Sequence, residues 1–185
     1  MTDLLSPTDP ATPRVEPAWR VEIRALYEEL DAEVARLGPI CELSGRCCRF
    51  LEYGHTLFVS APEVQFLMST APGPHRPLDR GETCPWQDDQ GRCTARDARP
   101  LGCRVYYCDP SYQNSGHELS ERFIARLKQT TETHGLPWNY APLHHHLEEE
   151  RARGRFLIEL ARNDPEASRQ PRSGHRREAS SNLDP

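Results

Sequence analysis

The chain has 185 residues, a formal net charge of −5 and a hydrophobic content of 36%. This length suits one domain with flanking tails, and the acidic balance disfavours a nucleic-acid partner, because nucleic acids are bound through basic surfaces. No apolar run is long enough to span a membrane and no basic-then-apolar leader opens the chain, so we expect a cytoplasmic protein with reduced thiols and no membrane contact.

The first part of the chain predicts a tail followed by a long helix. Residues 1–16 hold three prolines among small polar residues, which is typical of a disordered leader. A single domain over 17–163 follows. Its first element is an amphipathic helix over 17–37, because apolar residues recur in steps of three and four before Gly38 and Pro39 end the run. These apolar residues are Trp19, Ile23, Leu26, Leu30, Val34 and Leu37.

A short strand and a second helix are expected next. Residues 55–59 are a candidate strand. Ser60 and Glu63 have the spacing of a capping box and predict a helix over 60–70. The proline- and glycine-rich residues 71–81 predict a loop.

The pattern of the residues after 81 predicts irregular structure, two further helices and a second tail. Residues 84–108 are expected to be turn-rich, and helices are predicted over 117–134 and 143–162. Residues 164–185 return to a disordered composition. The expected fold is a small α-rich domain around an irregular, metal-organised cysteine core, with at most one short β element.

All seven cysteines lie between positions 41 and 108, in three groups. They are Cys41, Cys47, Cys48, Cys84, Cys93, Cys103 and Cys108. Disulfides are disfavoured because the number is odd and no secretory signal precedes the group. Inert buried thiols are a second alternative, but the neighbours are glycine, arginine, aspartate and proline rather than apolar residues. Metal ligation fits best, because thiolates are soft ligands for zinc and for iron–sulfur clusters.

The residues around the cysteines favour ligation as well. Gly45, Gly91 and Gly102 each stand one or two positions before a cysteine, where a positive φ lets the backbone wrap closely around an ion. Six arginines accompany the thiols and either offset thiolate charge or face solvent. They are Arg46, Arg49, Arg92, Arg96, Arg99 and Arg104. Adjacent Cys47 and Cys48 are hard to use as two ligands of one ion, because neighbouring side chains usually point apart. Two close ions or one cluster would use both thiols.

The order of these residues resembles the bacterial cysteine-cluster family described as zinc- or iron-chelating proteins, the CxxCxxCC type. The resemblance covers residues 41–108 and is most specific at Cys47–Cys48 and in the run from Arg99 to Cys108. It implies metal binding and no defined enzymatic activity, although some flagellin lysine methylases carry a similar cysteine cluster. Ser44 stands where the family has its second cysteine, which removes one of eight ligands.

Histidines offer nitrogen ligands at two places. His55 lies within the cysteine-containing span and is a candidate replacement for the ligand missing at Ser44. His144, His145 and His146 resemble a metal-binding tract, but consecutive residues on a helix point about 100° apart, so we expect a solvated or partly packed face.

The expected function is therefore metal binding by a cysteine cluster, with zinc, iron and an iron–sulfur cluster left open. The alternatives are a metal-dependent enzyme related to protein modification and a metal-stabilised interaction module. Familiar catalytic motifs are absent from the sequence, so an enzyme would depend on the metal or on a cysteine. A metal ion is the expected partner, a protein partner is left open, and enzymatic activity is undecided but disfavoured.

Overall fold

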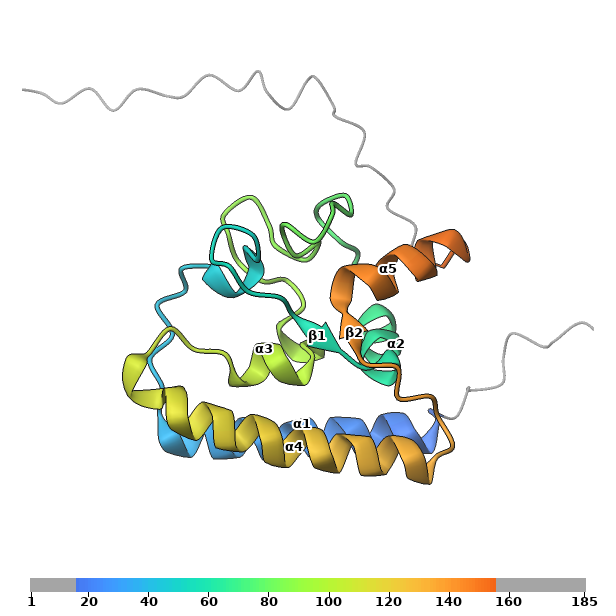
Figure 1. The fold of residues 1–185 in the computed structure, drawn as a ribbon, viewed down its shortest axis with the longest axis horizontal. Helices are drawn as coiled ribbons and strands as arrows, with labels where there is room; N and C mark the ends of the chain where they lie inside the picture. Colours follow the sequence, from blue (N-terminus) through green and yellow to red (C-terminus); the bar gives the residue numbers. More distant parts are fainter. Residues whose placement is uncertain (1–15, 156–185) are drawn as a thin grey trace, which may run out of the picture.

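A computed structural model describes residues 16–155. Its helices and strands are α1 (Ala18–Leu37), β1 (Phe58–Val59), α2 (Ala61–Thr70), α3 (Leu101–Val105), α4 (Gln113–Thr133), β2 (Ala141–Pro142) and α5 (Leu143–Ala152). Short 3₁₀ turns cover Arg46–Cys48, Arg96–Ala98 and Pro110–Tyr112. The prediction of an α-rich domain with at most one short β element is confirmed for the described residues (Figure 1).

Helices α1 and α4 lie side by side and run in opposite directions beneath the rest of the domain (Figure 1). The predicted apolar stripe of α1 is buried at Ile23, Leu26, Leu30 and Val34 and faces the stripe of α4. Arg126 and Glu29 add a surface ion pair of 2.7 Å across the two helices. Glycine ends α1 as expected, because Gly38 adopts a φ of 65°.

Helix α4 begins earlier than the sequence predicts. The expected start was residue 117, whereas the helix begins at Gln113 directly after the turn Pro110–Tyr112. The Asp109 carboxylate starts that turn by accepting a hydrogen bond from the Ser111 backbone amide. The 3₁₀ turn therefore runs directly into α4. The sequence pattern does not reveal this start, because the residues that follow Asp109 show no apolar periodicity.

The only sheet in the described residues is an antiparallel pair of two-residue strands. Phe58 pairs with Pro142 and Val59 with Ala141, so the predicted strand over 55–59 forms only at its end. Its partner was not predicted, because two residues that include a proline carry no strand pattern. The sheet lies between α3 and the pair α2 and α5 (Figure 1).

A buried carboxylate joins three helices. The predicted capping box is present, with Glu63 Oε2 accepting hydrogen bonds from the amide and hydroxyl of Ser60. Its other oxygen accepts from the Tyr27 hydroxyl at 3.0 Å and from the Leu101 amide at 2.9 Å. Glu63 therefore fixes the start of α3 relative to α1 and α2.

Helix α3 itself is a departure from the sequence-based expectation, which placed only turns between residues 84 and 108. Its five residues are too few for a periodic pattern, and its stability comes from tertiary contacts rather than from helix propensity. Arg104 supplies several of these contacts. Its buried guanidinium pairs with Asp31 and lies over the Tyr27 ring, with 4.3 Å to the centroid.

Several sequence-based predictions fall on residues that the structure does not describe. These are the leader over 1–16 except Glu16, the tail over 164–185 and residues 156–162 of the helix predicted over 143–162. That helix is shorter than predicted, because α5 ends at Ala152 and a turn follows in which Gly154 has a φ of 70°. Within residues 16–155, no helix is long and apolar enough to cross a membrane.

Candidate metal centre

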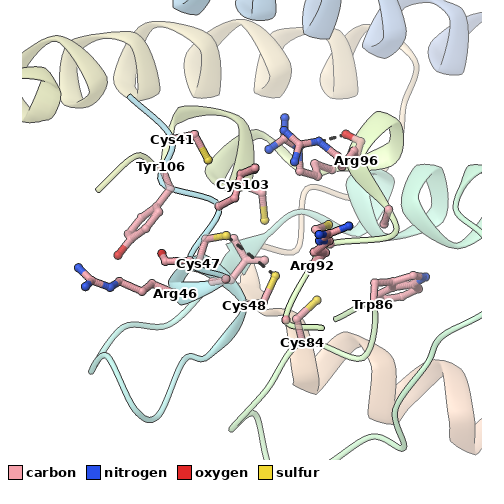
Figure 2. Close-up of a pocket in the computed structure, with 18 of the residues that line it drawn as sticks. Cys41, Arg46, Cys47, Cys48, Cys84, Trp86, Arg92, Arg96, Cys103 and Tyr106 are labelled. Atoms are coloured by element: carbon pink, nitrogen blue, oxygen red, sulfur yellow. Dashed lines mark hydrogen bonds between the residues drawn. The ribbon is translucent and has the colours of Figure 1, made fainter. Parts of the chain in front are cut away.

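All seven cysteines line one cavity of about 390 Å³. They come from the segment after α1, from the loop that follows α2, and from α3 and the segment after it. Each is a free thiol, so the disulfide alternative finds no support. Residues more than 60 positions apart in the chain therefore share one site, as the confined spacing predicts (Figure 2).

The first cysteine group curls so that adjacent thiols meet. Gly45 has a φ of 69° and starts the 3₁₀ turn Arg46–Cys48. The sulfurs of Cys47 and Cys48 lie 4.0 Å apart (Figure 2). Around a tetrahedral ion with metal–sulfur bonds of about 2.3 Å, the sulfurs are separated by about 3.8 Å. The expectation that these neighbouring side chains point apart is wrong, because the tight turn aims both thiols at one place.

The second group is a hairpin pressed against the first. The Cys84 amide donates to the Cys48 carbonyl at 2.8 Å. An isolated β-bridge then pairs Gln87 with Cys93 and closes the hairpin. Cys48 is buried, and the Cys84 and Cys93 thiols are among the neighbours that raise its pKa.

Gln87 joins the two glycine turns that precede these thiols. Its side-chain amide nitrogen donates to the carbonyls of Gly45 and Gly91, at 3.1 Å in each case. The sequence Gly-Arg-Cys occurs at both turns, and the two glycines touch. A Cβ built on Gly45 would lie 2.2 Å from the Gly91 oxygen. Gly45 is therefore required both for its positive φ and for close backbone approach, and Gly91 for its φ of 76°. Gly102 has no positive φ, so the expectation of a left-handed backbone is wrong at that position.

The third group places Cys103 on α3 and Cys108 beyond it. Cys103 is near enough to Cys84, Cys47 and Cys93 for their charges to raise its pKa, whereas the Cys108 sulfur lies 3.9 Å from the Ser44 hydroxyl oxygen. Cys41 is exposed at the edge of the cavity. In Figure 2 its sulfur stands apart from those of Cys47, Cys48 and Cys84.

The crowded thiols have unequal proton affinities. A hydrogen bond with Cys48 lowers the pKa of Cys47 to about 7 and that of Cys93 to about 6. The hydrogen bonds with Cys47, Cys84 and Cys93, together with burial, raise the pKa of Cys48. Burial first, then the neighbouring sulfurs, raises the pKa of Cys103. Thiolates this close together repel one another, so the deprotonated cysteines are stabilised when a bound cation offsets their charge.

The six arginines near the cysteines have different roles. Arg46, Arg92, Arg96 and Arg99 line the cavity. The Arg99 charge contributes to lowering the pKa values of Cys47 and Cys93, as expected for a group that offsets thiolate charge. Arg49 instead pairs with Glu52 and donates to the Ser44 carbonyl at 2.9 Å. Arg104 turns away toward Asp31 and is structural.

The histidines are not cavity ligands as they stand. His55 lines a smaller adjoining cavity of about 230 Å³ and stacks on Tyr106, with ring centroids 5.1 Å apart. Its Nδ1 is buried without a hydrogen-bond partner. His146 is buried with Nε2 3.2 Å from the Val59 carbonyl, so it belongs to the packing between α5 and β1. The three consecutive histidines therefore do not face one point.

The donor set fits a thiophilic metal. In residues 16–155, no three His, Cys, Asp or Glu side chains already adopt the arrangement of a finished metal site. The Cys47–Cys48 separation nevertheless falls close to the tetrahedral value, and all seven cysteines line the same cavity.

Two residues have positioning roles that the sequence does not indicate. Gln87 and Glu63 form hydrogen bonds across long sequence separations, so these roles are not recognisable from local spacing. Glu63 is recognisable as a capping residue but not as the group that anchors α3.

The chain was also compared with known proteins. No family model, curated protein or solved structure matches it. The resemblance to the CxxCxxCC family therefore stays a prediction, and the functional conclusion rests on the residues themselves.

Proposed function

We propose that this protein binds a thiophilic metal, zinc or iron, through its cysteine cluster. The observation that supports this proposal is the convergence of all seven cysteines on one cavity. Scattered structural thiols would occupy separate parts of the core. The resemblance of residues 41–108 to the CxxCxxCC family implies the same chemistry.

Cys47, Cys48, Cys84, Cys93 and Cys103 are the proposed main ligands, because they line one cavity and interactions among their thiols shift the pKa values of Cys47, Cys48, Cys93 and Cys103. Zinc held there would add folding free energy, and iron or an iron–sulfur cluster would add electron-transfer chemistry. Phe50 and Trp86 are buried beside the thiols and exclude water. Arg99 offsets the negative charge of the ligands.

Anaerobic purification with elemental analysis and absorption spectroscopy tests the proposal. We expect at least about one metal equivalent per chain, which four thiolates can hold. A brown protein with acid-labile sulfide indicates an iron–sulfur cluster, and a colourless protein with zinc indicates a mononuclear thiolate site. Seven freely titratable thiols and no metal would contradict the proposal.

Two variants test whether the buried thiols are the metal ligands. Cys48→Ser removes the buried central thiol, so we expect loss of most bound metal. Cys41→Ser removes the exposed thiol at the cavity edge and should leave the main site loaded. Equal effects of the two substitutions would show that the contacts between thiols do not define the ligands.

A metal-dependent enzyme, related to protein modification, is the second candidate. The cavity beside the thiols favours it, because a purely structural site is closed by its four protein ligands. Turnover of a substrate that depends on bound metal would support this candidate.

We place the protein in the cytoplasm. The odd number of cysteines supports this location, because a disulfide framework of an oxidising compartment would leave one thiol unpaired. Fractionation of cells, followed by thiol alkylation of the protein, tests it.

A further inference from the structure

A smaller cavity, of about 230 Å³, adjoins the cysteine cavity. We call it the aromatic cavity, because four aromatic rings line it, those of His55, Phe58, Tyr106 and Tyr140. Phe58, Tyr106 and Tyr140 are 45%, 40% and 42% exposed. They are three of the four phenylalanine, tyrosine and tryptophan side chains that are exposed in residues 16–155. Exposed aromatic surface that gathers at one hollow is typical of a ligand site.

The short sheet and α3, which are neighbours in Figure 1, place these rings in two stacked pairs. Phe58 stands opposite Pro142 in the sheet, and Tyr140 precedes Pro142 by two residues, so Phe58 and Tyr140 project from the same face. Their ring centroids are 5.9 Å apart. Tyr106 directly follows α3 and stacks on His55, with centroids 5.1 Å apart. Regular structure therefore holds both pairs in the wall of the aromatic cavity.

The charges around Tyr140 favour a cation. Among the described residues that line the aromatic cavity, none is an arginine, a lysine or a carboxylate residue. Burial first, and then the charges of Glu63 and Glu121, raise the pKa of Tyr140, so both carboxylates lie near this ring. Neither carboxylate forms an ion pair with a basic side chain of residues 16–155. Their negative charge is therefore available to a ligand beside Tyr140.

Arg46 is the cation that acts on the other pair of rings. Its charge acts on Tyr106, whose hydroxyl points toward Arg46 in Figure 2. The guanidinium lies over the Tyr53 ring, 5.4 Å from the centroid, and lines the cysteine cavity rather than the aromatic cavity. Phe58 and Tyr140 are therefore the rings that a positively charged ligand would prefer.

The chemistry of the wall selects the kind of cation. Aromatic rings attract cations to the negative charge of their faces. A bare ammonium group is strongly hydrated and needs hydrogen-bond acceptors, whereas an alkylated one presents methyl groups to the rings. The cavity is smaller than the roughly 300–1,000 Å³ of drug-sized sites, so it suits a headgroup. We propose that the aromatic cavity binds a small, fully alkylated ammonium group against the rings of Phe58 and Tyr140.

This site lies beside the candidate metal centre but does not require the metal. Cys47 and Cys103 line both cavities, so the ligand would lie next to two of the proposed metal ligands. The rings and carboxylates that attract the ammonium group include no cysteine. Loss of metal binding would therefore contradict the proposed function and leave this site in place.

Choline tests the site, because it carries a trimethylammonium group. The matched control is 3,3-dimethylbutan-1-ol, a neutral molecule of the same shape. Saturation-transfer NMR titrations on the full-length chain measure the binding of each through its methyl protons. We expect choline to bind at least about fivefold more tightly than the alcohol, the ratio that one cation–π contact provides. Equal binding of the two molecules, or no binding of choline, would overturn the proposal.

Variants locate the binding. Phe58→Leu and Tyr140→Leu should each weaken choline binding about fivefold to tenfold, whereas Tyr140→Phe keeps the ring and should change the affinity by less than about twofold. Glu121→Gln should weaken binding about twofold, because the carboxylate is exposed and its charge is screened.

Tyr53→Leu is the control for an exposed ring that does not line the aromatic cavity, and it should leave choline binding unchanged. Choline binding that survives both leucine substitutions at Phe58 and Tyr140, or that Tyr53→Leu weakens equally, would place the ligand elsewhere and refute the site. Circular dichroism checks that each variant folds, and if one of the two leucine variants does not, the other decides.

Discussion

Glycine at position 45 is the residue on which the approach of two cysteine turns depends most directly. It combines a φ of 69° with a distance of 2.2 Å from its would-be Cβ to the Gly91 oxygen. Gly54 has a similar φ of 63°, but nothing lies within 4 Å of its would-be Cβ. A comparison of substitutions at the two positions therefore separates the cost of backbone strain from the cost of steric overlap.

We predict that Gly45→Ala destabilises the protein more than Gly54→Ala. The left-handed conformation costs both alanines about 1–2 kcal/mol. Only Gly45→Ala must also push the Gly91 turn away, so its metal content should fall as well. Denaturant unfolding and elemental analysis of the two variants check this expectation. Equal losses of stability in the two variants would show that the close approach of the Gly45 and Gly91 turns does not stabilise the protein.

Gln87 is the second residue whose role can be measured. The residue is 3% exposed, and its amide is the donor to two turn carbonyls. Gln87→Leu removes both hydrogen bonds, so we predict a loss of about 2 kcal/mol in the free energy of unfolding. Gln90→Leu is the matched control, because Gln90 is exposed in the same hairpin. A control variant as unstable as Gln87→Leu would refute this role.

At the scale of elements, α3 depends on groups that lie far away in the sequence. Glu63 accepts a hydrogen bond from the Leu101 amide, and Arg104 pairs with Asp31 on α1. These contacts hold Cys103 against the other thiols. A five-residue helix with no capping side chain would not persist alone.

We therefore predict that Glu63→Gln loosens α3. The substitution removes a buried carboxylate that accepts four hydrogen bonds, and its new amide group faces donors. The expected loss in the free energy of unfolding is about 2–4 kcal/mol, accompanied by faster hydrogen exchange at the Leu101 amide. Glu52→Gln, at an exposed carboxylate, should change neither quantity. Unchanged exchange at Leu101 in Glu63→Gln would contradict the anchoring role.

The sequence predicts some elements better than others for physical reasons. Helix α1 follows from its apolar period and from Gly38, and α2 follows from its capping box, because both signals are local. Strand β2 and helix α3 are too short to show a period, and tertiary contacts stabilise them instead. The proposed ligands were identifiable from spacing, whereas the approach of the Cys47 and Cys48 sulfurs and the exposure of Cys41 required the three-dimensional arrangement.

At the scale of the whole molecule, two parts of the domain differ in what stabilises them. The α1–α4 pair buries continuous apolar stripes and α3 is tied to α1, so this half does not depend on a metal. The segment from Cys41 to Cys48 is different. Leu43 is 64% exposed, and the turn that follows is held by a few backbone bonds and by Gln87.

Metal removal should therefore act unevenly across the domain. Ordering each backbone residue costs about 1–2 kcal/mol, and residues 41–48 bury little apolar surface to offset that cost. Bound metal would supply the missing free energy through Cys47 and Cys48.

We predict that chelation accelerates hydrogen exchange at the amides of Cys48 and Arg49, which donate within this turn. The Leu101 amide, held by Glu63, should keep most of its protection. Hydrogen exchange on loaded and stripped protein measures both. Unchanged protection at Cys48 and Arg49 would show that the thiol site is rigid before metal arrives, and equal loss at Leu101 would show that the metal stabilises the entire domain.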